Sequence, residues 1–542
     1  MYFSFSSLDI FVIIGYFAIF FGIIYISSRG IKGGKDFKLS DTKFGAFAIM
    51  ATQGTSMKGA GSLVNVSGGA SRNGTGVLAS AQAPNIGGWM CVITGMARRL
   101  KVTSETKSIT SMGDIFYHRF GNDKCRAIST IGPIFVSMSM CASQISAIGM
   151  ILHMALYNTC GLTFTQGVII AGAVNLLCTM AGGLKSVVWT DVYQWWVMTP
   201  VMFFIIPFFA WQNGATFSTF SQLDAATFFS ISPTVSWIPL LISGILSCTV
   251  DLVYILRFVS SKDERAAVYG TSTAFFYTSL WAGLAVFLGI AAFIVLPELP
   301  SNDQVLYLFA ATILPSGVLG LFVGGLLATT ISSSDSYLHT AVTTFSSDLF
   351  PYFRKGKQAL TDRQELILDK TATVVISILS CVLVLYIPAL YDLLTYGMSI
   401  NSVTMFCPVL ATLFWRKSEE YGTIAGILGG LISYGIAVKF GWPLPVIIGT
   451  VVSGVLVFII GTFRNINYEM LPGFKRGDSK IINGLSQDTW IALGGIIGCV
   501  GGLVFSVGFA FWVNWILIIV GIAIFFLGVY LINKGVPKTI TD

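Results

Sequence analysis

A glycine-rich, polar stretch within an apolar segment most constrains what this chain can fold into. Residues 48–76 read AFAIMATQGTSMKGAGSLVNVSGGASRNG, a segment long enough to cross a membrane. Small, polar and charged residues interrupt its middle: Thr55, Ser56, Lys58, Gly59, Gly61 and Asn65. Glycine costs roughly 1 kcal/mol in a helix interior relative to alanine. We therefore expect the helix to unwind here against a cavity, where freed carbonyl groups can hold a ligand.

Lys58 places a positive charge at membrane depth. An unpaired lysine at the bilayer centre costs about 2.5 to 3.5 kcal/mol on the insertion scale. We therefore expect its ammonium to face the protein interior and to have an acidic partner. Asp191 and Asp335 are the candidate partners.

The composition indicates a polytopic membrane protein. Hydrophobic residues make up 54% of the 542 residues and charged residues 11%. Repeated apolar runs of about 20 residues indicate helical spans rather than a barrel. Hydropathy and helix-breaking residues predict about fifteen transmembrane helices, which start near residues 8, 44, 77, 129, 164, 187, 235, 266, 317, 369, 394, 421, 444, 489 and 514.

Positive charge predicts the orientation in the plasma membrane. With fifteen crossings, all but three of the 32 Lys and Arg residues, Arg257 among the majority, fall on one side. The exceptions are Lys58, Arg72 and Lys439. The positive-inside rule then places the N-terminus outside and the C-terminus in the cytoplasm. The net charge of +7 therefore reflects contact with the lipid bilayer and not binding of nucleic acid.

Three further polar interruptions each contain an acid at membrane depth. They are AGGLKSVVWTDVYQ (181–194) with Asp191, ILSCTVDLVYILR (245–257) with Asp251, and LLATTISSSDSYLHT (326–340) with Asp335. The last also holds the adjacent Ser332 and Ser333, and hydroxyls with backbone carbonyls suit a hard alkali cation. The alternative is that each hydroxyl bonds a carbonyl one turn back or packs helices closely. Buried acids are costlier, so we favour functional roles for Asp191 and Asp251.

The chain carries no sequence pattern of an enzyme or of a resident metal centre. Its nine cysteines form no CxxC pair, and its three histidines lack metal-ligand spacing. No nucleophile, base and orienting residue recur together, and no phosphate-binding loop is present. We expect neither catalysis nor a cofactor, apart from a coupling ion.

Several motifs resemble the sodium:solute symporter family. The similar segments are GGLKSVVWTDVYQ (182–194) between its fourth and fifth core helices, ISSSDSYLHTAVTTFSSDLF (331–350) in its eighth, SMGDIFYHRFG (111–121) in its cytoplasmic helix, and ILRFVSSKDERAA (255–267) at its sixth-helix exit. AQAP (81–84) and WRKSEEYGTIAGILGG (415–430) are closest to the high-affinity choline transporters of that family. The similarity extends to about residue 440.

The resemblance implies an all-α, LeuT-type fold, which is an inverted repeat of five plus five helices. Its core helices one and six are broken at the substrate site. The whole chain, 1–542, would form a single transporter domain. Its parts would be one extra N-terminal helix (8–28), a first repeat (44–211), a second repeat (235–415) and about four extra C-terminal helices (421–532). The oligomeric state stays open.

The resemblance also suggests site residues. A sodium site would use the backbone carbonyls of Ser56, Gly59 and Thr329 and the hydroxyls of Ser332 and Ser333. Candidates for coupling or gating are Lys58, Asp191, Asp335 and Tyr254. Candidates for substrate binding are Asn65, Gln82, Asn85 and Asp251.

Together these observations predict a secondary active transporter that imports a small polar organic solute by alternating access, coupled to sodium. Asp251 and the choline-type motifs favour a cationic or zwitterionic amine. In an alternative, Lys58 replaces sodium and transport is proton-coupled or uncoupled, since two unit charges about 4 Å apart repel by roughly 4 kcal/mol at an effective dielectric of 20. A transporter-like membrane sensor and a channel are further alternatives.

Overall fold

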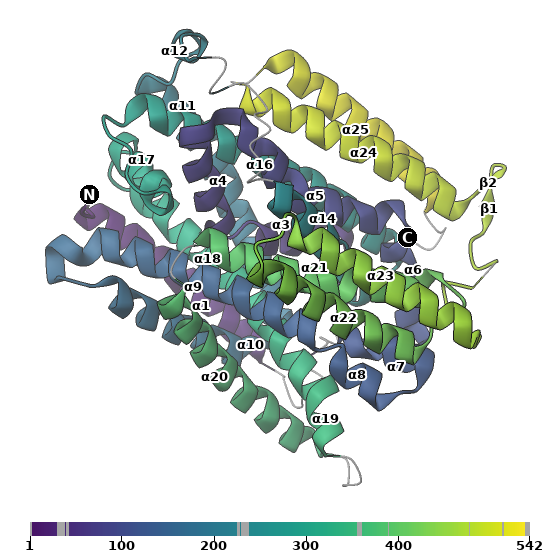
Figure 1. Cartoon of the computed structure of the whole chain (residues 1–542). Coiled ribbons are helices and arrows are strands. Elements are labelled where there is room, and N and C mark those ends of the chain that lie inside the picture. Colours follow the sequence, from purple (N-terminus) through teal and green to yellow (C-terminus); the bar gives the residue numbers. More distant parts are fainter. Residues whose placement is uncertain are drawn as a thin grey trace.

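The chain folds into a bundle of helices with one small hairpin (Figure 1). The computed structural model describes residues 3–29, 38, 43–224, 228, 238–354, 360–387, 390–475, 477–511 and 514–536. The helices of the first half are α1 (Ser7–Ser28), α3 (Ala46–Met57), α4 (Ala60–Asn73), η1 (Gly74–Val77), α5 (Leu78–Ile93), α6 (Met96–Thr106), α7 (Met112–Phe120), α8 (Asp123–Ile128), α9 (Ile131–Cys160), α10 (Phe164–Pro200), η2 (Val201–Ile205), α11 (Ile206–Gln212) and α12 (Phe217–Ser221).

The helices of the second half are α14 (Ile238–Thr249), α15 (Leu252–Ser260), α16 (Glu264–Val295), η4 (Asn302–Gln304), α17 (Val305–Ile313), α18 (Val318–Thr344), η5 (Phe345–Leu349), α19 (Phe350–Phe353), α20 (Asp362–Tyr386), α21 (Leu390–Phe414), α22 (Glu420–Lys439), α23 (Pro445–Arg464), α24 (Gln487–Ala510) and α25 (Trp515–Gly535). The hairpin pairs β1 (Ile481–Ile482) antiparallel with β2 (Leu485–Ser486).

Twelve helical segments in the described residues are long and apolar enough to cross a membrane. The other three predicted spans correspond to the interrupted pair α3 and α4, to α5, and to the shorter apolar helix Phe164–Met180. The prediction of an all-helical polytopic membrane fold is therefore confirmed. A total of fifteen crossings stays a prediction.

The helix break predicted around Lys58 is present. α3 ends at Met57 and α4 begins at Ala60, so Lys58 and Gly59 lie between two half-helices. Gly59 permits close packing here, because a Cβ at this position would collide with Gln144 of α9 and lie 2.7 Å from Ser333 Oγ of α18. The unwound backbone is thus enclosed by neighbouring helices. Backbone N–H and C=O groups without a helical partner require such an environment at membrane depth.

A second break divides α14 from α15 at Val250 and Asp251. Asp251 is the N-cap of α15, and its Oδ1 accepts a hydrogen bond of 2.8 Å from the backbone N–H of Val253. An aspartate at this position also stabilises the positive end of the helix dipole. The predicted start of the second repeat at residue 235 lies outside the described residues.

A third interruption lies within α10 at Gly183, where φ is 53° and ψ is −169°. This conformation is essentially restricted to glycine. It separates the first part of α10, Phe164–Met180, from the membrane-length segment Gly183–Gln212, which continues from α10 through η2 into α11 and carries Asp191. The interruption lies in the motif GGLKSVVWTDVYQ (182–194), which the resemblance places between two core helices.

Two of the sequence motifs meet at one end of the bundle, around Arg126. Its Nε donates to Asp348 Oδ1 at 2.8 Å, and its Nη2 donates to Asp114 Oδ1 at 2.6 Å. Asp348 also accepts hydrogen bonds from Ser111 Oγ at 2.7 Å and from the backbone N–H of Gly113 at 3.1 Å. These bonds connect α7 and α8 to η5, which directly follows α18.

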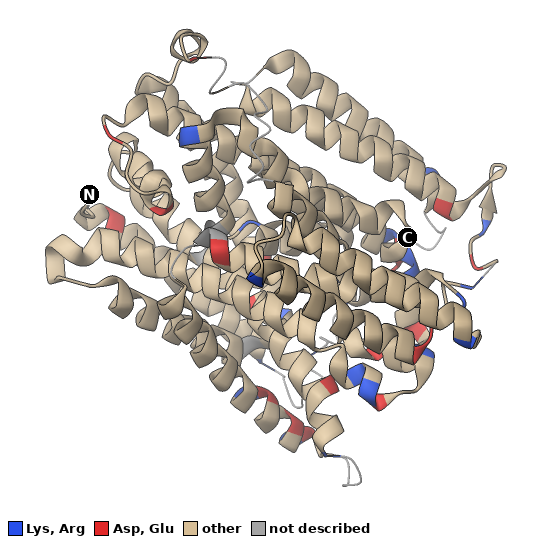
Figure 2. Cartoon of the chain, viewed as in Figure 1, with Lys and Arg blue, Asp and Glu red and all other residues tan. Residues whose placement is uncertain are grey.

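Basic residues gather at the end of the bundle that holds α6, α7 and α8, and the N-terminus lies at the opposite end (Figures 1 and 2). Arg72 of α4 donates to Asn302 Oδ1 and to the carbonyl of Pro300. The assignment of Arg257 to the cytoplasmic loops is wrong, because its side chain is fully buried in the bundle. The charge rule counts basic residues and does not detect one that is neutralised inside the protein.

The Gly183 conformation gives a prediction for stability. Gly183→Ala should lower the free energy of unfolding by about 1 to 3 kcal/mol, because alanine strains this backbone. Thermal unfolding of the purified protein measures the effect. Gly22→Ala in α1 is the matched control, since a Cβ there meets nothing within 4 Å and alanine favours the helix. Equal stability of the two variants would contradict the conclusion that the backbone conformation at residue 183 requires glycine.

Candidate functional site

Hydroxyl groups from two helices surround the carboxylate of Asp191, which is fully buried. Thr52 of α3 donates to Asp191 Oδ2, and Ser56 donates to the same oxygen at 3.3 Å. Ser332 of α18 donates to Asp191 Oδ1. We call Asp191, Thr52, Ser56 and Ser332 the Asp191 cluster. Carboxylate and hydroxyl oxygens, with unwound carbonyls nearby, are a donor set that fits an alkali cation.

The Asp191 cluster continues to a buried arginine. Ser56 Oγ lies 3.0 Å from Ser336 Oγ, and Arg257 Nη2 donates to Ser336 Oγ at 2.9 Å. Arg257 also interacts electrostatically with Asp191. The guanidinium therefore balances part of the negative charge that Asp191 brings into the bundle.

Sequence analysis missed Thr52, Ser336 and Arg257. Thr52 precedes Ser56 by four residues and Ser336 follows Ser332 by four, so each pair shares one helix face. This four-residue spacing could have placed Thr52 and Ser336 in the same site as Ser56 and Ser332 from the sequence alone.

The remaining predicted sodium ligands lie along the contact between the α3 break and α18. The hydroxyl of Ser333 is 3.2 Å from the carbonyl oxygen of Thr55 and 2.9 Å from that of Thr329. The carbonyl of Gly59 accepts from Ser62 Oγ at 3.1 Å within α4. Sodium binding by Ser56, Gly59, Thr329, Ser332 and Ser333 stays a prediction.

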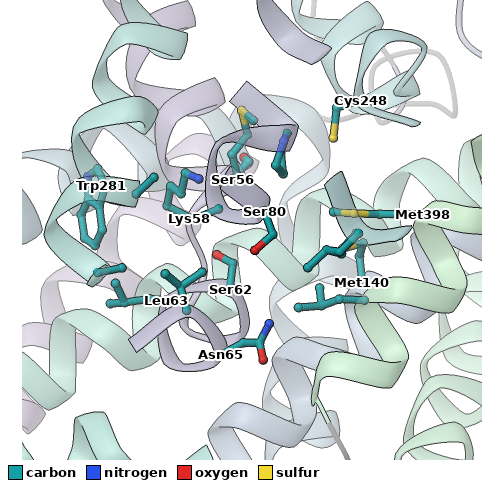
Figure 3. Close-up of a pocket in the computed structure, with 18 of the residues that line it drawn as sticks. Ser56, Lys58, Ser62, Leu63, Asn65, Ser80, Met140, Cys248, Trp281 and Met398 are labelled. Atoms are coloured by element: carbon teal, nitrogen blue, oxygen red, sulfur yellow. The ribbon is translucent and has the colours of Figure 1, made fainter. Parts of the chain in front are cut away.

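A cavity of about 80 Å³ lies beside the same break (Figure 3). Its polar lining residues are Ser56, Lys58, Ser62, Asn65, Ser80, Gln144, Tyr254 and Tyr337. The apolar lining includes Leu63, Met140, Trp281 and Met398. A cavity needs about 10 to 15 Å³ of such volume to hold one water molecule, so this cavity has room for more than one.

Lys58 lines this cavity, and 8% of its surface is exposed. No ion pair joins Lys58 to an acid within the described residues, whereas Asp191 is enclosed by hydroxyls and Arg257. The predicted Lys58–Asp191 ion pair is therefore wrong, because Lys58 lines the cavity, whereas the carboxylate of Asp191 on α10 accepts hydrogen bonds from Thr52, Ser56 and Ser332. Asp335 is buried in α18 beside Thr179 of α10, and it does not pair with Lys58 either.

The predicted substrate residues divide into two groups. Asn65 lines the cavity, as does the proposed gating residue Tyr254. Asp251 is not among the lining residues; it caps α15 and accepts a hydrogen bond of 3.4 Å from Tyr337, which does line the cavity.

Gln82 and Asn85 are not among the residues that line the cavity. Gln82 Nε2 donates to Ser506 Oγ at 2.6 Å and to the carbonyl of Ser279 at 3.2 Å. Asn85 Nδ2 donates to Gln82 Oε1 at 2.8 Å. In this conformation the two amides join α5 to α16 and α24, and their role in substrate binding stays a prediction.

Two broken helices beside a cavity, with a buried carboxylate next to the first break, define a secondary transporter of the LeuT type. The family model for the sodium:solute symporter family matches residues 37–430, and the chain belongs to this family. The prediction of a membrane transporter rather than an enzyme is confirmed. The nearer likeness to choline transporters stays a prediction.

Relatives and solved structures agree with this assignment. The chain is 23% identical over 434 residues to a sodium/pantothenate symporter of Haemophilus influenzae, covering 77% of this chain and 87% of the relative. It is 24% identical over 366 residues to a sodium/sialic acid symporter of Proteus mirabilis, covering 61% and 71%. The substrate-bound, outward-open structure of a Na⁺-coupled sialic acid symporter superposes with a TM-score of 0.71 at 18% identity, covering 86% of this chain and 100% of that one. This likeness confirms the fold.

The Asp191 cluster leads to a prediction about sodium. Wild type should be more stable in NaCl than in KCl at equal ionic strength, because a ligand that binds only the folded state stabilises it, by about 2.7 kcal/mol at a hundredfold excess over Kd. Asp191→Asn and Ser332→Ala should each reduce this difference in thermal stability. Asp369→Asn, at a buried carboxylate of α20, is the control and should keep it. A full sodium response in Asp191→Asn would exclude Asp191 as a ligand.

Proposed function

We propose that the chain imports a small polar organic solute by alternating access, with sodium bound at the Asp191 cluster and the solute in the adjacent cavity. The observation that supports this most is the position of Ser56. Its hydroxyl contacts Asp191, and the same residue lines the cavity. A ligand in either site therefore acts on the same turn of α3. By linkage, any change that one ligand makes in the affinity for the other is matched by the same factor in the reverse direction.

A second candidate is transport in which Lys58 takes the place of sodium. The position of Lys58 favours sodium coupling instead, because its side chain lines the cavity while hydroxyls and Arg257 surround Asp191. Tyr254 and Asp335 remain our candidates for gating. Tyr254 lines the cavity on α15, so movement of this half-helix changes access to it.

The amine predicted from Asp251 needs revision in the light of these positions. Asp251 caps the N-terminus of α15 and is not among the residues that line the cavity, whereas Lys58 is one of them. A cationic amine would be repelled by the ammonium of Lys58. A zwitterion remains compatible because its carboxylate would be attracted.

We further propose a plasma-membrane protein with its N-terminus outside and its C-terminus in the cytoplasm. The gathering of basic residues at the end opposite the N-terminus supports this orientation (Figure 2). Each predicted repeat begins with a broken helix. We propose that these repeats, 44–211 and 235–415, are the two halves that move against each other during transport.

One experiment separates sodium coupling from the lysine alternative. Thermal stability is measured in NaCl and in KCl for wild type, Lys58→Ala and the control Lys439→Ala. Sodium coupling predicts that all three gain stability in sodium. A response confined to Lys58→Ala would mean that the lysine occupies the cation's place, and transport would then be proton-coupled or uncoupled.

A further inference from the structure

An apolar groove of about 1240 Å³ lies apart from the solute cavity and shares none of its lining residues. Residues of η2, α11, α12, α16, α24 and α25 line it, and we call it the aromatic groove because more than half of these residues are aromatic. The described lining includes no Asp, Glu, Lys, Arg or His. Small-molecule sites measure about 300 to 1,000 Å³. The aromatic groove therefore suits a longer, apolar ligand.

The aromatic groove has a buried floor and an open rim. In the floor, Tyr277, Phe287 and Phe509 are at most 8% exposed, whereas Phe204 and Phe217 at the rim are 71% and 72% exposed. The segment Gly183–Gln212 and the helices α16, α24 and α25 are long and apolar enough to cross a membrane. Exposed apolar side chains of such helices contact the hydrocarbon of the bilayer. The open side of the groove is thus available to lipid.

Polar residues and tryptophans mark one end of the aromatic groove. Thr216 is the N-cap of α12 and Asn514 is the N-cap of α25, and both line the groove. Trp211 and Trp515, which also line it, are more than half exposed, and tryptophan is enriched at the membrane–water interface. α11 and α12 lie away from the end of the bundle that holds α6, α7 and α8 (Figure 1). This end of the groove therefore lies at the depth of the lipid head groups.

The floor of the aromatic groove contacts the wall of the solute cavity. The ring of Phe203 lies 5.6 Å from that of Trp281, centroid to centroid, and 6.0 Å from that of Tyr277. Trp281 lines the solute cavity (Figure 3). Tyr277 also packs on α3, because a Cβ at Gly54 would lie 2.7 Å from its Cδ1. A ligand on Phe203 and Tyr277 would therefore be one aromatic ring away from the solute.

The backbone is irregular where it lines the aromatic groove. Phe203 and Phe204 belong to η2, which is a π-helix between Pro200 and Pro207. Pro207 has no N–H for the carbonyl of Phe203, four residues earlier. A π-turn is rare and occurs frequently at functional sites. This irregularity supports a binding role for the groove.

We propose that the aromatic groove binds an acyl chain of a membrane phospholipid, with the head group at the Asn514 end. Lipid tails are as apolar as these side chains, so the affinity comes from van der Waals contact. A concave groove contacts a chain on several sides, whereas a flat helix surface contacts it on one. Anionic head groups are recognised by Lys and Arg, and the described lining has neither, so we expect no preference for them.

Lipid titrations in KCl without solute test the proposal, which does not depend on the proposed function. Thermal stability of the delipidated protein in detergent is measured with dioleoylphosphatidylcholine, dioleoylphosphatidylglycerol or diheptanoylphosphatidylcholine. These lipids differ from the first either in head group or in chain length. We expect the two dioleoyl lipids to stabilise the protein equally. The diheptanoyl lipid should stabilise it much less, because its short chains fill less of the groove.

A matched pair of variants locates the effect. Ile522→Trp adds bulk at a residue that lines the aromatic groove, and it should raise the lipid concentration for half-maximal stabilisation about tenfold or more, since it displaces the chain. Ile519→Trp makes the same change in α25 at a residue that is 64% exposed and is not among those lining the groove. This control should respond as wild type does.

The outcomes separate the possible occupants. Equal responses of the two variants would overturn the proposal, as would no response to the dioleoyl lipids, equal stabilisation by the diheptanoyl lipid, or a preference for phosphatidylglycerol. Should Ile522→Trp not fold, the comparison of chain lengths on wild type decides. A cryo-electron microscopy map in dioleoylphosphatidylcholine nanodiscs gives the direct view: density for an acyl chain in the groove supports the proposal, and density for a polypeptide overturns it.

Discussion

The fold depends on the cost of unpaired backbone groups inside a bilayer, which is several kcal/mol for each group. A helix at membrane depth can therefore break only where other groups receive its free N–H and C=O groups. At the first break Ser333 donates to the carbonyl of Thr55, and at the second Asp251 accepts from the N–H of Val253. The polar residues at these breaks thus satisfy backbone groups whether or not a ligand is bound.

The two breaks are satisfied differently, and the difference gives the cavity its chemistry. α15 begins with a carboxylate of the chain, whereas α4 begins after a glycine and beside a lysine. The carbonyl side of the α3 break faces α18 and the Asp191 cluster, and Ser56 belongs to both this cluster and the cavity. The proposed cation and solute sites are therefore separated by a single turn of α3. Coupling between them needs no long pathway through the protein.

The sequence was sufficient to predict the breaks, because each is caused by local residues that are unfavourable in an apolar helix. The family resemblance suggested Ser332 as a sodium ligand and Asp191 as a coupling residue, and the structure brings the two side chains into contact. Partners set by helix rotation could not be predicted. The direction of Lys58, the inward position of Arg257 and the turn of Gln82 toward α24 depend on packing between segments far apart in the chain. Periodicity assigns a residue to a helix face but does not say which distant helix that face meets.

The most direct test of the account is a high-resolution cryo-electron microscopy structure of the protein in NaCl. The account predicts density for an ion in direct contact with the carboxylate of Asp191 and the hydroxyl of Ser332, with the Lys58 ammonium in the cavity on the other side of Ser56. A Lys58 ammonium turned into the Asp191 cluster, with no ion density there, would contradict it.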